Sequence, residues 1–120
     1  MKPETLAKLR AWVGLRGMSC WSLVRDAWLL EGVRLPDDYF GGALPMMRIV
    51  EPAKEPVLPG DIVVIRNHAF ATNHCGIMLS ERDFIHALED FGVLLSRTDR
   101  QPWEKRIVGF LRLKSEDREA

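Results

Sequence analysis

The chain has 120 residues, of which 47% are hydrophobic and 28% charged, a composition that fits one globular domain with a single hydrophobic core. Its 17 basic residues balance its 17 acidic ones, so net charge gives no reason to expect nucleic acid as a partner. No apolar run approaches the roughly 20 residues that cross a bilayer, and the first residues do not resemble a secretory signal. We therefore expect one domain over residues 1–114, a polar tail over 115–120, synthesis in the cytoplasm and no membrane insertion.

The first part of the chain predicts two helices. Apolar residues recur at three- and four-residue intervals over residues 6–13 and again over residues 20–28, as one buried helical stripe requires. Gly14 and Gly32 are placed to end these helices. Ser19 is placed to be the N-cap of the second helix.

The rest of the chain predicts a loop followed by a sheet. Five prolines and a Gly-Gly pair between Val33 and Gly60 predict a long loop, which in a compact domain is usually functional. Five runs typical of strands follow, at residues 61–66, 74–79, 83–88, 92–97 and 106–113. Helices followed by strands predict an α+β fold with an antiparallel sheet of about five strands.

Cys20 opens the second predicted helix and is the candidate nucleophile. The helix N-terminus stabilises a thiolate and so lowers the pKa of a thiol placed there. The alternative interpretation is a small buried hydrophobic residue within the apolar stripe, because free cysteines are often buried. Cys20 alone does not decide between the two.

His74 and His86 are the candidate partners of this thiol. A hairpin loop centred on Ser80 would place their imidazoles directly opposite each other on one face of the sheet. The Nε2 atom of His74 would then take the Cys20 proton, while His86 would accept a hydrogen bond from Nδ1–H of His74. A loop centred half a residue later would send the rings to opposite faces, and either histidine could be an ordinary hydrogen-bonded residue.

Strand alternation assigns the neighbouring residues to opposite faces. Gly76 falls on the face of His74, where we expect open space for a substrate backbone, whereas Cys75 points into the core. Trp21 lies off the apolar stripe and beside Cys20, so we expect it at the rim of the substrate cleft. The alternative interpretation is that Cys75, and not Cys20, is the reactive thiol.

A zinc site is the rival interpretation of the three histidines and two cysteines. The sequence lacks the closely spaced Cys-Cys or His-His pairs typical of zinc ligands. We therefore expect neither metal nor cofactor, with His68 a solvated loop residue.

Several fragments, in this order, resemble the NlpC-type family of papain-like cell-wall peptidases. Cys20–Val24 resembles its nucleophile helix, Leu58–Val63 its Pro-Gly-Asp entry to the first strand, His74–Ile77 its catalytic-histidine strand, Phe84–Ala87 the strand of its third catalytic residue, and Val108–Arg112 its closing strand. The resemblance spans about residues 12–113. It implies a papain-like fold, with Cys20, His74 and His86 as catalytic residues. It also implies hydrolysis of the bond between D-glutamate and a diamino acid in peptidoglycan stem peptides, without a cofactor.

Two positions depart from that family. Ser19 stands where the family usually has Asp, and residues 14–19 offer no counterpart of a Tyr that lines the family's site. Trp12 would partly fill the place of this Tyr as a substrate-binding residue. The departures leave open an inactive assembly module of the same fold, or a protease or amidase effector acting on another amide.

Trp21 and the continuation Val24-Arg25-Asp26 are more similar to the phage-tail members of the family than to its secreted members. This resemblance implies phage-tail proteins as partners. It also implies incorporation in a virion or phage-like tail that acts on the cell wall.

Overall fold

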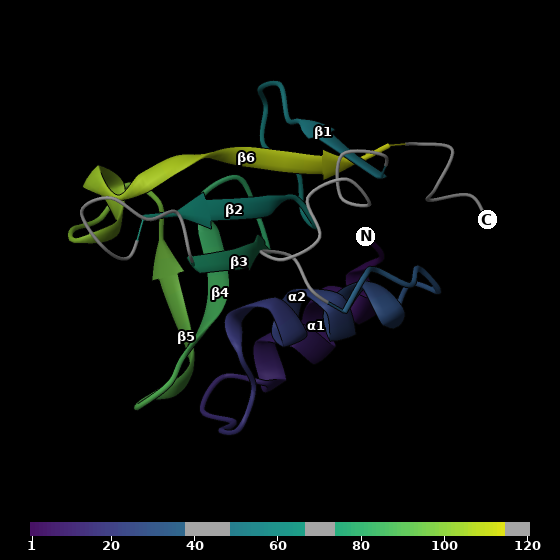
Figure 1. Ribbon diagram of the computed structural model, residues 1–120, viewed down its shortest axis with the longest axis horizontal. Coiled ribbons are helices and arrows are strands. Elements are labelled where there is room, and N and C mark those ends of the chain that lie inside the picture. Colours follow the sequence, from purple (N-terminus) through teal and green to yellow (C-terminus); the bar gives the residue numbers. More distant parts are fainter. Residues whose placement is uncertain (38–48, 67–73, 115–120) are drawn as a thin grey trace.

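The computed structural model describes residues 1–37, 49–66 and 74–114, and it has an α+β fold, as predicted (Figure 1). Helices α1 (Pro3–Ala11) and α2 (Cys20–Leu29) are followed by strands β1 (Val50–Pro52), β2 (Ile62–Ile65), β3 (His74–Met78), β4 (Asp83–Leu88), β5 (Gly92–Arg97) and β6 (Ile107–Leu113), with a short 3-10 helix, η1 (Trp103–Lys105), before β6. The strands form one antiparallel sheet in the order β1-β6-β2-β3-β4-β5. The predicted tail at 115–120 lies outside the described residues, as does His68.

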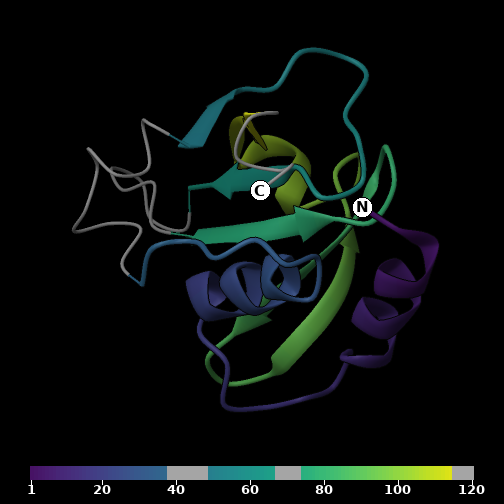
Figure 2. The ribbon, with the colours of Figure 1, turned by 90° about the vertical axis from the view of Figure 1, so that its right-hand side faces the viewer.

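Both helices lie on one side of the sheet, with α2 beneath β3 (Figure 2). Five of the six strands coincide with the predicted runs to within one residue at each end, and β4 and β5 coincide with them fully. The sixth strand, β1, lies in the segment predicted to be a loop, where Val50 pairs with Leu113 of β6. It is three residues long and ends at a proline, which an edge strand tolerates because one side of its backbone makes no ladder bonds. Neither helix in the described part of the chain is long and apolar enough to cross a membrane.

The N-terminus of α2 is fixed by a reciprocal cap. The Ser19 hydroxyl accepts a hydrogen bond from Ser22 N at 3.1 Å, and the Ser22 hydroxyl accepts one from Ser19 N at 2.9 Å. These bonds satisfy backbone donors that the first turn of a helix leaves unpaired. The prediction of Ser19 as N-cap is confirmed, and Cys20 is the first residue of the helix.

Side chains from the two faces of the sheet form two separate hydrophobic clusters. The helix-face cluster joins Leu9 and the buried stripe of α2 to strand residues that include Ile62, Cys75, Ile77 and Ile85. The outer-face cluster contains Val63, Ile65, Met78 and Phe84, with Trp103 packed against it. Residues adjacent along a strand belong to different clusters, as period-two alternation requires.

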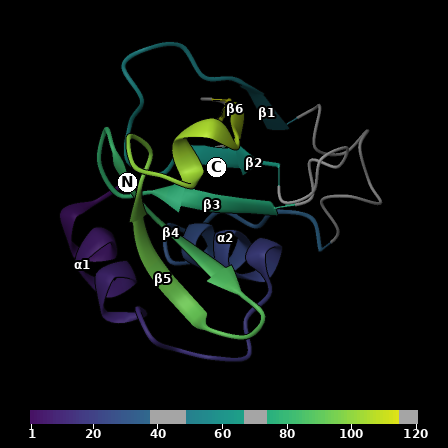
Figure 3. The ribbon, with the colours of Figure 1, turned by 90° about the vertical axis from the view of Figure 1, so that its left-hand side faces the viewer.

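The segment before α2 is attached to the hairpin of β4 and β5, which Figure 3 shows in front of α2. Gly14 N donates to Val93 O, and Val93 N donates to Leu15 O, both at 2.8 Å. A Cβ atom at Gly92 would lie 2.4 Å from Leu15 O, and the φ of Gly92 is +80°, so this close approach requires glycine. The entry to Cys20 is thereby held against the sheet.

The Pro-Gly-Asp segment before β2 is bonded to β6 and to α2. Asp61 is 3% exposed and receives hydrogen bonds from Arg112 Nε at 2.9 Å and from Arg112 Nη2 at 2.8 Å. Leu58 N donates to the same carboxylate at 2.8 Å. Trp28 Nε1 donates to Gly60 O at 3.0 Å, which joins α2 to the start of β2.

Candidate active site

Cys20 lies at the positive end of α2, half-buried, in the wall of a cavity of about 460 Å³. The wall is formed by residues 17–20, by His74 at the start of β3 and by residues 87–89 at the end of β4. Glu89 is the carboxylate in this wall. The predicted nucleophile and its predicted base therefore share one cavity.

This cavity lies where β3 and β4 separate. The two strands pair at Ile77 with Ile85 and at Met78 with Phe84, whereas β4 continues to pair with β5 as far as Leu88. The first part of β3 is therefore not held against β4. His74 is on the outer face by alternation and Cys20 is on the helix face, and the separation of the strands lets them meet.

The thiol of Cys20 is strongly acidified. A hydrogen bond from the Cys75 side chain makes the largest contribution, and a hydrogen bond to His74 and its charge lower the pKa further. Partial burial opposes these effects, and together they lower the pKa of Cys20 to about 4. The thiolate is the reactive form of cysteine, so this low pKa suits Cys20 to the role of candidate nucleophile.

His74 and His86 form a direct hydrogen bond, with Nε2 of His74 lying 2.8 Å from Nδ1 of His86. The ring nitrogens are the reverse of those predicted, because Nδ1 of His74 was expected to face His86. The register also differs: the pair Met78 and Phe84 centres the hairpin on Glu81, one residue later than predicted. A shift of one whole residue in the centre keeps both rings on one face but makes them diagonal neighbours, so the prediction of directly opposed rings was wrong.

His86 is fully buried and held from its other side. Its Nε2 lies 2.9 Å from Ser96 Oγ, and the indole of Trp103 meets its ring edge to face with centroids 4.6 Å apart. Burial, with a smaller contribution from the charge of His74, lowers the pKa of His86 to about 3. A neutral imidazole has one donor and one acceptor nitrogen. The neutral tautomer that accepts from His74 at Nδ1 and donates from Nε2 to Ser96 satisfies both bonds, and it is the one that suits an orienting group for His74.

Ser96 and Trp103 complete the surroundings of the imidazoles, and the sequence analysis did not assign either to the site. The signal for Ser96 was present in the short hairpin of β4 and β5. That hairpin sets His86 opposite Leu94, so Ser96, two residues further along, is a diagonal neighbour on the same face. Trp103 lies in η1, far along the chain from His86, and no local sequence pattern predicts that its indole contacts the His86 ring.

Gly76 does not provide open space for a substrate. A Cβ atom there would lie 2.6 Å from Ile85 O and 3.1 Å from the Cβ of His86. The space that Gly76 leaves is filled by Ile85 and His86, so the prediction of open space at Gly76 is wrong. Gly76 instead allows β4 to approach closely enough for the two imidazoles to bond.

Neither tryptophan that was predicted to bind substrate lies in the described wall of the Cys20 cavity. Trp21 is only 5% exposed, and its Nε1 donates to Pro36 O at 2.7 Å, so the prediction of a cleft-rim position is wrong. The chain that follows α2 folds back over the indole and buries it. Trp12 ends α1 and packs, half-buried, against the helix-face cluster.

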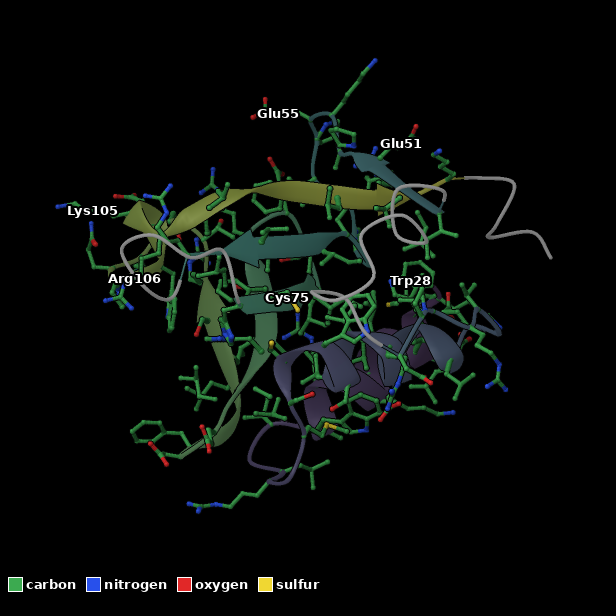
Figure 4. The ribbon with its side chains drawn as sticks, in the orientation of Figure 1. Trp28, Glu51, Glu55, Cys75, Lys105 and Arg106 are labelled. Atoms are coloured by element: carbon green, nitrogen blue, oxygen red, sulfur yellow. The ribbon has the colours of Figure 1, made fainter. Side chains whose placement is uncertain are left out.

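Cys75 points to the helix side of β3, as predicted from strand alternation (Figure 4). It is fully buried, and its hydrogen bond to Cys20 and its burial raise its pKa well above the ordinary value. Cys75 is therefore a neutral thiol beside a thiolate. Within residues 1–37, 49–66 and 74–114, no three His, Cys, Asp or Glu side chains gather as a metal ion would require.

A sequence model of the NlpC/P60 family matches residues 9–112. The chain belongs to this family. NlpC/P60 proteins are generally cell-wall peptidases that use a cysteine. The family accounts for a cysteine at a helix N-terminus facing a histidine on the sheet. No protein of curated function matches the chain significantly.

Solved NlpC/P60 structures share the fold. A protein from Staphylococcus aureus, described as similar to lipoprotein, aligns with a TM-score of 0.68 at 18% identity over 94% of this chain and 42% of its own. An NlpC/P60 protein from Bacillus cereus aligns with a TM-score of 0.71 at 14% identity over 92% and 39%. NlpC2 from Trichomonas vaginalis aligns with a TM-score of 0.67 at 16% identity over 88% and 44%. The chain thus spans less than half the length of each.

Proposed function

We propose that this chain is a cysteine peptidase that hydrolyses the bond between D-glutamate and a diamino acid in peptidoglycan stem peptides. One observation carries the proposal: the acidified thiol of Cys20 hydrogen-bonds to His74, whose ring is in turn held by His86. Acyl transfer by a cysteine requires a nucleophile hydrogen-bonded to a base, and the base in turn hydrogen-bonded to an orienting group. Membership in a family of cell-wall peptidases supports the substrate class.

In the first half of the reaction the Cys20 thiolate attacks the carbonyl carbon of the scissile amide. A carbon–sulfur bond forms, and the carbonyl electron pair moves onto oxygen. The backbone N–H of Cys20 and the positive end of α2 stabilise this oxyanion. His74, protonated, gives its proton to the leaving nitrogen as the carbon–nitrogen bond breaks.

In the second half, His74 removes a proton from water, and the oxygen of that water attacks the acyl carbon. The carbon–sulfur bond breaks, the acid product leaves and the thiolate is restored. His86 keeps its proton on Nε2, toward Ser96, and offers Nδ1 as an acceptor throughout. It therefore fixes the orientation of the His74 ring without exchanging a proton.

The test uses a defined muropeptide that contains one D-glutamyl–diamino acid bond, with products identified by mass spectrometry. The wild-type chain should release the two fragments, and Cys20→Ala should release neither while keeping its circular dichroism spectrum. His74→Ala should also be inactive. Cleavage by Cys20→Ala, or no cleavage by the wild type, contradicts the proposal.

We also propose that the protein is carried by a phage or phage-like tail and acts on the cell wall from there, with tail proteins as its partners. The support is the sequence similarity of Trp21 and the Val24-Arg25-Asp26 continuation to phage-tail members. Antibody against the chain should label the tails of purified particles in electron micrographs. Unlabelled particles, with the protein found only free in the lysate, contradict this proposal.

One observation favours a second candidate, a tail-assembly module that keeps the fold without the activity. Ser19, in place of the family's Asp, lies in the cavity wall with its hydroxyl engaged in the cap of α2. A wild-type chain that incorporates into tails but cleaves no muropeptide would support this second candidate.

A further inference from the structure

Cys75 is a second thiol in the site that the proposed reaction does not use. It is the second residue of β3 and follows His74 directly. Its side chain is fully buried in the helix-face cluster, against which Cys20 packs, and it hydrogen-bonds to the sulfur of Cys20. Two sulfur atoms from α2 and β3 are therefore in contact beside the base.

The two thiols differ in access and in charge. Cys20 is half-buried in the wall of a cavity of about 460 Å³, whereas Cys75 is sealed beneath it. A small neutral oxidant such as hydrogen peroxide fits this cavity and meets Cys20 first. Thiolates react with peroxide and neutral thiols do not, so the two residues have different roles in any oxidation.

We propose that Cys20 and Cys75 form a peroxide-responsive site, in which Cys75 resolves an oxidised Cys20 into a reversible intramolecular disulfide. The proposal rests on the proposed function only in taking Cys20 as a reactive thiolate. Peroxide is the oxidant, and the peptidase is switched off while the bond exists. Reduction by a dithiol returns both cysteines to their resting state.

The chemistry has two balanced steps. The Cys20 thiolate attacks one oxygen of hydrogen peroxide, the oxygen–oxygen bond breaks, and Cys20 becomes a sulfenic acid as hydroxide leaves. The hydroxide released in the first step takes the Cys75 proton to form water, the Cys75 thiolate attacks the Cys20 sulfur, and the sulfur–oxygen bond breaks as a second hydroxide leaves. The two thiols lose two electrons in total, which the peroxide accepts.

Forming the disulfide brings the two sulfurs from hydrogen-bond contact to the bonded distance of about 2.05 Å. Cys20 is the first residue of α2, and Cys75 lies in the part of β3 that is not paired with β4. Cys20 is therefore at the end of its helix, and Cys75, although it pairs with Val64 of β2, has no ladder bonds to β4 that a backbone adjustment would break. The disulfide also protects Cys20, because a sulfenic acid without a resolving thiol proceeds to the irreversible sulfinic acid.

The test treats the native protein with hydrogen peroxide at neutral pH and measures its mass, followed by peptide mapping without reduction. The wild type should lose the mass of two hydrogen atoms, with Cys20 and Cys75 recovered as one linked peptide. Cys75→Ser is the matched control, because the hydroxyl keeps a donor beside Cys20 but cannot form the bond. This variant should gain oxygen on Cys20 instead.

Reversal is the second readout and needs no peptidase activity. After excess peroxide and then dithiothreitol, wild-type Cys20 should again be labelled by iodoacetamide, whereas Cys20 of Cys75→Ser, which has proceeded to the sulfinic acid, should remain unlabelled. Irreversible oxygen addition to wild-type Cys20, or no oxidation of Cys20 at all, overturns the proposal. A protein that forms the disulfide but cleaves no muropeptide overturns only the proposed function, and one that cleaves muropeptide without forming the disulfide overturns only this inference.

Discussion

The Nε2 atom of His74 lies 2.8 Å from Nδ1 of His86, so the two imidazoles are linked through fixed and different nitrogens. In the neutral tautomer of His86 that donates Nε2–H to Ser96 Oγ, Nδ1 is the acceptor. Nε2 of His74 must then carry the proton, which leaves Nδ1 of His74 as the nitrogen available to Cys20. This tautomer of His86 is the one that its proposed orienting role requires.

Replacement of His86 tests the orienting role. His86→Ala should lower kcat for muropeptide cleavage about 10- to 100-fold, the range for losing a group that orients a histidine. His86→Asn should lose less, since its amide oxygen can accept from Nε2–H of His74. Single-turnover kinetics with both variants check this, and equal activities for His86→Ala and the wild type contradict it.

Ser96 is a positioning residue that acts through His86. Ser96→Ala should reduce kcat about fivefold, as expected for one neutral hydrogen bond of about 1 kcal/mol, and leave KM unchanged. Ser96→Thr keeps the hydroxyl and should restore most of the rate. A purely structural role would alter thermal stability without the difference in kcat, so melting curves of both variants separate the explanations.

The reactivity of Cys20 should follow its low pKa. The hydrogen bond from Cys75 makes the largest contribution, burial opposes it, and His74 adds to it, so that the pKa falls to about 4. The thiolate exists above its pKa, so iodoacetamide labelling should be nearly constant between about pH 6 and about pH 8, where an ordinary thiol of pKa about 8.5 gains reactivity steeply. Cys75→Val removes the hydrogen bond that contributes most to the low pKa of Cys20, so the pH midpoint of Cys20 labelling should move upward. The titratable groups around Cys20 are His74, Cys75 and Glu89.

The control for this measurement is the unfolded protein in denaturant, in which both cysteines should show the ordinary profile. A native profile that rises throughout this range would show that the thiol is not acidified.

Gly76 and Gly109 form a matched pair of strand glycines. Gly76→Ala places a methyl group 2.6 Å from Ile85 O, so it should destabilise the fold by about 1–3 kcal/mol and disturb the bond between the imidazoles. Gly109→Ala meets nothing within 4 Å and should leave stability and activity close to those of the wild type. Urea unfolding and muropeptide cleavage measure both effects. Equal losses in the two variants contradict the steric explanation.

The buried carboxylate of Asp61 should contribute to stability and not to chemistry. Asp61→Ala leaves Arg112 without its bidentate partner and should cost about 3 kcal/mol of the free energy of unfolding. The pH dependence of Cys20 labelling should be unchanged, because neither residue lies in the wall of the Cys20 cavity. Urea unfolding of Asp61→Ala, of Arg112→Met and of the double variant isolates the coupling. Additive effects in this cycle would show that the pair contributes little.

The sequence predicted the fold class, both helices and five strands because each of these elements has a local signal. The hairpin of β4 and β5 is bounded by turn residues, and its predicted limits match the structure. Strand β1 escaped prediction because three residues carry no periodicity and its formation depends on pairing with β6, more than 50 residues away in the chain.

The site was predicted in its residues more fully than in its geometry. Helical spacing and the Ser19 cap were sufficient to place Cys20 at the start of its helix. The alternation of side chains along the strands was sufficient to put both histidines on one face of the sheet. The register was missed by one residue because the loop is closed by Leu79 N donating to Asp83 O at 2.8 Å, which centres it on Glu81. Trp21 was misplaced because its indole joins the helix-face cluster and donates to Pro36 O, in a segment that helical periodicity does not describe.

The alternation at the start of β3 bears on how this protein can evolve. His74 and Cys75 are neighbours in sequence, yet one faces the imidazole partner and the other faces the helix. An insertion or deletion of one codon between Cys75 and Ile77, the first residue of β3 that pairs with β4, would move both side chains to the opposite face, so the base and the second thiol would trade places. We expect related genes to tolerate substitutions in this short stretch far better than changes in its length.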